Sequence, residues 1–205
     1  MPRLDRAFFD RPTLVVAREL LGQRLVRLEG AQRLAGLITE TEAYVGPEDL
    51  ACHARVGRTA RTAVMFGPPG IAYVYFTYGM HWLLNVVTEA EGFPAAVLIR
   101  GMRPEEGAAT MARRRGTARA VRNNVRQPPT LPSRLTDGPA KLTQALRIDG
   151  GWNGHDLCGR EARLFVERAA PVPEGQVVTG PRIGLNRTPE PWKSIAWNFR
   201  AWPGE

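Results

Sequence analysis

Short runs of alternating apolar and polar residues follow one another through most of this chain. A period of two is typical of a β-strand that buries one of its faces. Such runs occupy residues 24–28, 34–44, 71–77, 83–88, 95–100 and 164–167. Strands in consecutive runs pair most simply with their neighbours along the chain, so the sequence predicts an α+β fold around a largely antiparallel sheet.

Two helices are predicted to flank this sheet. The first begins near Asp10 and Pro12 and ends before Gly22, and the second begins at residues 137–139. Apolar residues at helical spacing are Leu14, Ala17 and Leu21 in the first helix and Leu142, Ala145 and Leu146 in the second. The proline-rich residues 127–133 are predicted to form a loop.

The size and composition of the chain favour one domain. Its 205 residues are 43% hydrophobic, enough to bury a core, and we expect a single domain over residues 1–205. No run approaches the roughly 18 apolar residues of a membrane span, and the charged residues 1–5 do not resemble a secretory signal. Two cysteines, Cys52 and Cys158, are too few for a disulfide framework. We therefore expect a cytoplasmic protein without a membrane segment.

Basic residues exceed acidic residues by 28 to 20, and the resulting net charge of +8 favours polyanionic partners. A GC-rich genome, which enriches arginine codons, explains the total equally well but not the distribution. Residues 107–136 hold no acidic residue and seven arginines: Arg113, Arg114, Arg115, Arg119, Arg122, Arg126 and Arg134. Such a block is commonly a solvated face or a mobile loop, and here contact with nucleic acid is favoured.

Two carboxylates and an aromatic ring share one face of the second predicted strand. The period of two places Glu40, Glu42 and Tyr44 on the same side. Paired carboxylates can serve as acid and base in glycoside chemistry. Judged on spacing alone, an exposed face with merely solvated glutamates is the commoner meaning of this pattern. The pattern therefore marks these residues only as candidates.

A second candidate segment covers residues 73–85. Tyr73 and Tyr75 share a strand face, and Tyr78-Gly79 is predicted to lie at a turn between two strands, with Tyr78 at its tip. Aromatic residues in strands are most often part of the core. In a basic protein, a tyrosine at a hairpin tip can also act as a wedge between base pairs. A wedge, a carboxylate and several aromatic faces together indicate an enzyme that flips a base out of a duplex.

Several blocks of sequence occur in a fixed order along the chain. They are Glu40-Thr41-Glu42-Ala43-Tyr44-Val45-Gly46-Pro47-Glu48-Asp49, His53, the run from Gly70 through Gly79-Met80, Asn85 and Ile99-Arg100, with Phe8-Phe9-Asp10 before them and Gly138-Pro139-Ala140-Lys141-Leu142 and Arg182-Ile183-Gly184 after them. In order and separation these blocks resemble the alkyladenine (3-methyladenine) DNA glycosylase family, over nearly the whole chain. The resemblance implies a single mixed domain with a curved antiparallel sheet, flanking helices and a protruding β-hairpin.

The resemblance also implies an activity. Enzymes of this family flip alkylated or deaminated purines out of double-stranded DNA and hydrolyse the N-glycosidic bond, which leaves an abasic site. They use no metal and no organic cofactor, and we expect this chain to act as a monomer.

Single residues match the family's catalytic pocket. Glu42 matches the general base, which would activate a water molecule for attack at C1′ and stabilise oxocarbenium character at the sugar. Glu40 then has a structural role beside it. Tyr44 and Tyr75 match the aromatic residues that enclose the flipped base, and His53 closes the pocket against the base edge. A cationic alkylated purine over an aromatic face gains ~0.5–2 kcal/mol.

Other matches concern the DNA and the choice of base. Tyr78 matches the intercalating wedge, with Met80 beside it. Asn85 matches a residue of the pocket floor that would collide with the N2 amino group of normal guanine. Arg100 matches an arginine that grips a phosphate next to the flipped nucleotide. Lys141, near the start of the second predicted helix, either grips a phosphate or is a surface charge, and the family's use of water as nucleophile argues against a Schiff base.

The remaining polar residues indicate less. No other Cys or His lies at ligand spacing from Cys52 and His53, so we expect no metal. His81 and His155 are interpreted as structural or surface residues. Residues 185–199 match the family only loosely, so they do not define the lower pocket wall or the preferred lesion.

Three functions remain open from the sequence. The leading one is a monofunctional DNA glycosylase. The second is a non-catalytic DNA damage-binding protein with the same wedge and basic surface, which would not need Glu42. The third is a carbohydrate glycosidase that uses Glu40 and Glu42, and the basic surface disfavours it.

Overall fold

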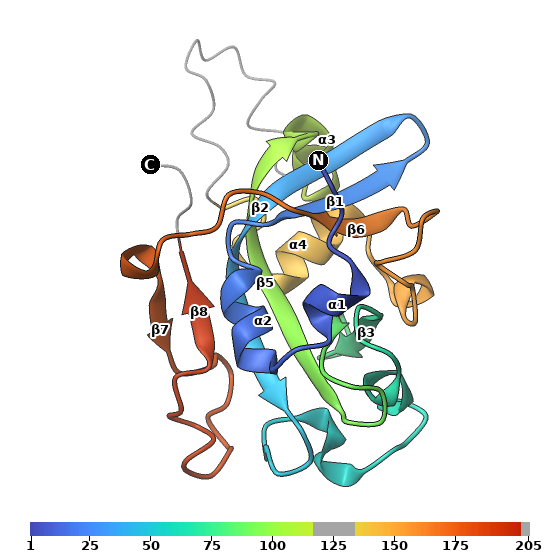
Figure 1. The fold of residues 1–205 in the computed structure, drawn as a ribbon. Coiled ribbons are helices and arrows are strands. Elements are labelled where there is room, and N and C mark those ends of the chain that lie inside the picture. Colours follow the sequence, from blue (N-terminus) through green and yellow to red (C-terminus); the bar gives the residue numbers. More distant parts are fainter. Residues whose placement is uncertain (117–133, 202–205) are drawn as a thin grey trace.

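The structure is a computed structural model that describes residues 1–116 and 134–201, and an antiparallel sheet of eight strands organises it. The strands are β1 (Arg24–Glu29), β2 (Gln32–Val45), β3 (Ala72–Thr77), β4 (His81–Val87), β5 (Ala95–Glu106), β6 (Leu164–Glu167), β7 (Val178–Gly180) and β8 (Asn198–Arg200). Six of them follow the order β3-β4-β5-β2-β1-β6, and β8 joins β2 to β7. The sheet curls into a half-barrel around the long strands β2 and β5 (Figure 1). The predicted α+β class and the curved antiparallel sheet are confirmed.

Strand β2 changes partners along its length. Residues 32–37 pair with β1, whereas residues 40–42 pair with β8, and β5 pairs with β2 along the other edge. The pairing with β5 shifts register at Ala35/Gly36 and twice between Ile38 and Thr41. Bulges bend a strand and increase its twist. They place Glu42 between β5 and β8, in the middle of the curled sheet.

The six predicted strands are all present. Strand β5 is longer than predicted, and β4 begins two residues earlier, at His81. Strands β7 and β8, of three residues each, were not predicted. The helices are α1 (Arg6–Phe9), α2 (Thr13–Glu19), α3 (Ala108–Arg114) and α4 (Pro139–Leu146), of which α1 and α3 were not predicted. None of the helices in the described ranges is long and apolar enough to cross a membrane.

The two predicted helices pack against the sheet. Helix α4 buries Leu142, Ala145 and Leu146, as expected, and begins with Pro139 at its first turn. Helix α2 contacts β2 and β5 (Figure 1). The chain leaves it through Gly22, whose φ of +78° allows the turn into β1.

The apolar residues at helical spacing in the first predicted helix are not all buried. Leu14 is 36% exposed, whereas Val16 and Ala17 are buried. The helix starts at Thr13, whose backbone N–H and hydroxyl both donate to the Glu89 carboxylate. This anchor turns Thr13, rather than Leu14, toward the interior.

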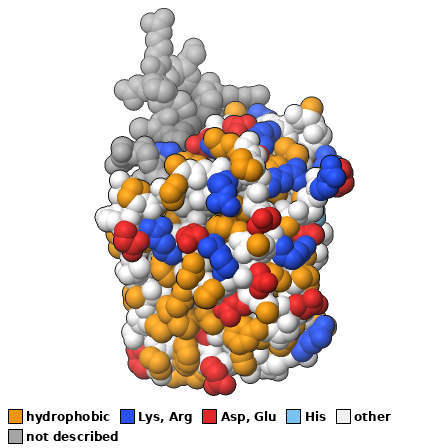
Figure 2. Space-filling model, in the orientation of Figure 1, with side chains coloured by type: hydrophobic (Ala, Val, Ile, Leu, Met, Phe, Trp, Pro, Cys, Tyr) orange, Lys and Arg blue, Asp and Glu red, His pale blue; other side chains and the backbone are white. Residues whose placement is uncertain are grey.

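The structure describes only part of the basic block, and the nucleic-acid contact expected for it stays a prediction. Residues 108–114 form α3, and its two arginines and the following Arg115 have partners within the protein. Arg114 pairs with Glu29 and donates to the Ala145 carbonyl, Arg113 donates to Thr110, and Arg115 donates to Gln144. The face in Figure 2 likewise shows basic and acidic side chains interspersed. Arg119, Arg122 and Arg126 lie outside the described residues, as does the predicted loop 127–133.

The core of the described residues is divided into a large cluster, a smaller one, and a third formed by Val26, Ala35, Ala162 and Phe165. The large cluster lies between the sheet and the helices. The smaller one is formed by Cys52, Ala54, Met65, Tyr73, Val87 and Ala96. Tyr44 and Tyr75 pack against this second cluster. The segment between β2 and β3, with its short 3₁₀ helices His53–Val56 and Ala63–Phe66, completes this end of the molecule.

Candidate active site

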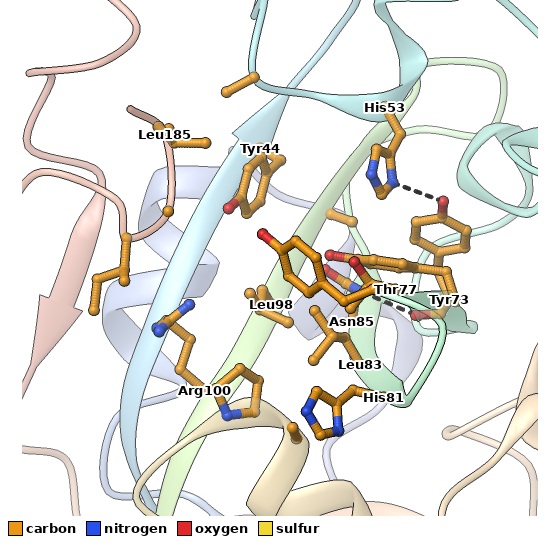
Figure 3. Close-up of a pocket in the computed structure, with 18 of the residues that line it drawn as sticks. Tyr44, His53, Tyr73, Thr77, His81, Leu83, Asn85, Leu98, Arg100 and Leu185 are labelled. Atoms are coloured by element: carbon orange, nitrogen blue, oxygen red, sulfur yellow. Dashed lines mark hydrogen bonds between the residues drawn. The ribbon is translucent and has the colours of Figure 1, made fainter. Parts of the chain in front are cut away.

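A cavity of about 350 Å³ opens where β2, β3, β4 and β5 meet residues 183–185. Its volume falls within the roughly 300–1,000 Å³ of small-molecule pockets. The predicted pocket residues Tyr44, His53, Tyr75 and Asn85 all line it, and so does Arg100 (Figure 3). The structure therefore brings together side chains that are up to 56 positions apart in the chain.

Aromatic rings form one wall of the cavity. The rings of His53 and Tyr75 meet edge to face, and their centroids are 4.5 Å apart. The ring centroids of Tyr73 and Tyr75 are 5.4 Å apart. Nδ1 of His53 is 2.9 Å from the Tyr73 hydroxyl (Figure 3). Burial, together with the charges of Arg61 and Arg55, lowers the pKa of His53 to about 4. The imidazole is therefore neutral at physiological pH.

Asn85 is held rigidly at the inner end of the cavity. It faces Tyr73 across the β3–β4 pair, and its Nδ2 donates to the Tyr73 carbonyl at 3.1 Å (Figure 3). The side chain is only 3% exposed. A buried amide fixed by a cross-strand hydrogen bond cannot easily move aside for an incoming group.

The Glu42 carboxylate is fully buried and accepts four hydrogen bonds. Its Oε2 accepts from the Tyr44 hydroxyl at 2.9 Å and from Arg100 Nη1 at 3.3 Å. Its Oε1 accepts from the backbone N–H of Ile183 at 2.6 Å and from Asn198 Nδ2 at 3.1 Å. These four donors fix the orientation of the carboxylate.

This carboxylate lies directly behind the cavity wall. Three of its four donors, Tyr44, Arg100 and Ile183, line the cavity, whereas Glu42 is covered by them. Burial, with the Glu42 charge as the next cause, raises the pKa of Tyr44 well above its usual value. The Tyr44 hydroxyl therefore stays protonated and continues to donate.

Glu40 shares the same face of β2, as the period of two predicts. Arg100 Nε donates to Glu40 at 3.1 Å, and Asn198 Nδ2 donates to it at 2.8 Å. Arg100 and Asn198 thus bridge Glu40 and Glu42. Arg100, predicted to grip a phosphate, lies in the cavity wall and is paired with both carboxylates.

The β3–β4 hairpin carries the predicted tyrosine at its tip. Tyr78 and Gly79 have φ of +52° and +67°, and Met80 N–H donates to the Thr77 carbonyl at 3.2 Å. Two positive φ values in succession suit the right-handed twist of the flanking strands. Tyr78 is 81% exposed and Met80 is 67% exposed. The expected hairpin tip is confirmed, and two apolar side chains project from it.

Lys141 lies in the first turn of α4 at the edge of this region. Its Nζ is 2.8 Å from the Asp137 carboxylate, and both side chains are about one-third exposed. The preceding Pro139 and Ala140 line the cavity, as does His81, which was expected to be an ordinary histidine. Within the described ranges, no three His, Cys, Asp or Glu side chains are grouped so that they could hold a metal ion.

Comparison with known proteins agrees with this geometry. The sequence model of the family described as methylpurine-DNA glycosylase (MPG) matches residues 7–202. The chain belongs to this family. It is 48% identical over 183 residues to the Myxococcus xanthus protein named "Putative 3-methyladenine DNA glycosylase", and the match covers 89% of this chain and 82% of the relative. A protein of the same name from Methanocella arvoryzae is 47% identical, with 94% and 92% covered.

Membership of the methylpurine-DNA glycosylase family confirms the resemblance found in the sequence. It makes the chain a DNA-binding hydrolase of base excision repair. Sequence reasoning missed two of the donors that hold Glu42, Ile183 and Asn198. They lie 141 and 156 positions from it, and no local spacing could reveal such contacts.

Proposed function

We propose that this methylpurine-DNA glycosylase removes alkylated and deaminated purines from double-stranded DNA by hydrolysing their N-glycosidic bonds. The observation that carries the proposal is the Glu42 carboxylate. It is buried and hydrogen-bonded to three residues that line an aromatic cavity. A carboxylate in this position is suited to act on a sugar whose base occupies the cavity.

Recognition begins at the hairpin. Tyr78, at the exposed tip of the hairpin, enters the duplex and fills the space that the damaged nucleotide leaves. The extruded base stacks between Tyr44 and Tyr75, and the neutral ring of His53 meets its edge. Asn85, fixed on the Tyr73 carbonyl, excludes bases that carry an amino group at the purine 2 position.

Hydrolysis uses water as the nucleophile. When one of the covering donors, Tyr44, Arg100 or Ile183, moves aside, Glu42 orients a water molecule from the cavity side. It accepts the proton of this water while the water oxygen bonds to C1′. The C1′–N bond breaks, and its electron pair leaves with the base. The Glu42 anion also stabilises the positive charge that develops at the sugar. Arg100 orients Glu42 and Glu40, and its place in the cavity wall lets it contact the phosphate of the flipped nucleotide.

Single-turnover excision tests this proposal. Duplex oligonucleotides that carry hypoxanthine or ethenoadenine are incubated with excess enzyme and then cleaved with alkali. We expect strand breaks only after alkali. Glu42→Gln should lower the rate by at least ~100-fold and keep lesion binding, because the amide preserves the shape of the carboxylate. A near-normal rate in Glu42→Gln would contradict the proposal.

Glu40→Gln is the matched control, because Glu40 shares Arg100 and Asn198 with Glu42. We expect it to lose far less activity. A damage-binding protein would instead bind lesions tightly and yield no abasic product. A carbohydrate glycosidase would depend on both carboxylates and act on sugar polymers rather than on DNA.

A further inference from the structure

A fully buried ion pair joins Asp49 to Arg182. Both side chains are inaccessible to solvent. Arg182 Nη2 donates to Asp49 Oδ1 at 2.9 Å, and Nη1 donates to Oδ2 at 2.5 Å. The two groups therefore meet in a bidentate pair, which fixes their orientation as well as their separation. Neither residue was assigned a role from the sequence.

Arg182 holds the strand that carries the catalytic carboxylate. Its Nη1 also donates to the Ala43 carbonyl at 2.9 Å. Its guanidinium lies over the ring of Tyr44, 4.7 Å from the centroid, and 5.0 Å from the ring centroid of Trp197. Arginine is suited to such a place because one planar group can pair with a carboxylate and stack on an aromatic ring at once.

Asp49 holds the segment that leads to His53. Its carboxylate accepts from the backbone N–H of Val45 at 3.2 Å and from that of Ala51 at 3.0 Å. Its carbonyl accepts from Cys52 N–H at 2.8 Å. These bonds fix the turn between the end of β2 and the helical turn that begins at His53.

The pair also reaches the carboxyl-terminal side of the cavity. Arg182 immediately precedes Ile183, whose N–H donates to Glu42 at 2.6 Å. Holding the Arg182 side chain therefore limits the movement of that N–H. One ion pair thus connects the three parts of the wall: β2 with Tyr44, the segment with His53, and residues 183–185.

Stability alone is a poor reason for such a pair. Two charges lose their hydration on burial, and a well-packed apolar replacement is often as stable. Catalytic groups, in contrast, need placement to a fraction of an ångström, and a misplacement of about 1 Å can cost on the order of 100-fold in rate. The contacts of Asp49 and Arg182 are those that such placement requires.

We propose that Asp49 and Arg182 are positioning residues for the glycosylase reaction. They set the distance between the Glu42 carboxylate, the stacking face of Tyr44 and the Ile183 N–H. The inference rests on the proposed function. It predicts that weakening the pair slows the chemical step more than it weakens lesion binding.

Asp49→Asn and Arg182→Lys test the proposal. Asp49→Asn keeps the shape of the carboxylate and removes its charge. Arg182→Lys keeps the positive charge and removes the planar guanidinium that makes two parallel hydrogen bonds. The matched control is Glu167→Gln, because Glu167 is also buried and also meets an arginine, Arg33, through two bonds, of 3.2 and 2.7 Å. Three quantities are measured for each variant well below its unfolding temperature: the single-turnover rate constant, the Kd for lesion duplex and Tm.

The expected result is a split between rate and binding. Asp49→Asn and Arg182→Lys should lower the rate constant by about 10- to 100-fold and change Kd by less than about threefold. Glu167→Gln should lower Tm and leave the rate near that of the wild type. Rates within about twofold of the wild type in Asp49→Asn or Arg182→Lys would overturn the inference, and so would a similar rate loss in Glu167→Gln.

Failure of both variants to fold would also overturn the inference, because the pair would then be a requirement of folding. The proposed function is judged separately, on Glu42→Gln. Full activity in Glu42→Gln defeats the proposed function. An inactive Glu42→Gln beside a normal Asp49→Asn defeats only the positioning role.

Discussion

Acid is expected to destabilise this glycosylase in part through His53. The imidazole is enclosed by Tyr73 and Tyr75 and bonded to the Tyr73 hydroxyl. Folding therefore requires its neutral form. The perturbation is a change of pH from about 7.5 to about 5, applied to the wild type and to His53→Gln, whose amide can keep a hydrogen bond to Tyr73.

The magnitude follows from the difference between the two pKa values. Burial first, and then the charges of Arg61 and Arg55, lower the pKa of His53 from 6.5 to about 4. Between these values the unfolded chain binds a proton that the folded protein does not. The contribution of neutral His53 to the free energy of unfolding is therefore complete above the pKa of the unfolded chain. It declines as the pH falls toward 4. The linkage relation gives a loss of about 2 kcal/mol at pH 5. Because the ring borders an open cavity, we expect about 1–2 kcal/mol.

Urea unfolding followed by tryptophan fluorescence measures this loss. The free energy of unfolding is determined at both pH values for the wild type, His53→Gln and His81→Gln. The last variant removes an exposed imidazole and controls for the substitution itself. The wild type should lose about 1–2 kcal/mol more than His53→Gln over this interval. Equal losses in the two proteins would refute the reasoning.

Two further predictions concern the hairpin and the floor of the cavity. Tyr78→Gly removes the wedge and places glycine at a φ of +52°, so the free energy of unfolding should change by no more than about 1 kcal/mol. Excision from duplex DNA should fall strongly, and excision from a single-stranded oligonucleotide should fall less; equal losses on both substrates would contradict the wedge role. Asn85→Ser should open space for the guanine amino group and raise the excision of undamaged guanine, measured by the same alkali assay. An unchanged guanine rate, in a variant still active on alkylated adenine, would argue against steric exclusion by Asn85.

Much of the sheet could be predicted because its longer strands carry their own alternating pattern. Strands β7 and β8 could not, since three residues are too few to show a period and their pairing with β2 depends on distant segments. Helix α3 was not predicted, because its arginines made the segment look like a charged surface or loop. Arg114 is neutralised by Glu29, which lies 85 positions earlier, and local charge density gave no sign of that partner.

The candidate site also has residues that local patterns predicted and residues that they did not. A single strand period grouped Glu40, Glu42 and Tyr44, and a turn motif located Tyr78. Asp49 and Arg182 both stand in sequence blocks that resemble the family, but they lie 133 positions apart, and no local pattern shows that they pair. Contacts of this kind are fixed by the folded topology rather than by local patterns.

The strand order places the hairpin that probes DNA at the edge of the sheet and the general base in its interior. Strand β3 is an edge strand of the sheet, and it forms the hairpin with β4. Glu42, in contrast, lies on β2, which is paired with β5 on one side and with β8 on the other. Changes of length or composition at residues 78–80 therefore alter how the protein probes a duplex without disturbing the strand that holds the general base. The two tasks are modular. Variants of this turn can therefore change the search of DNA while Glu42 and its donors stay in place.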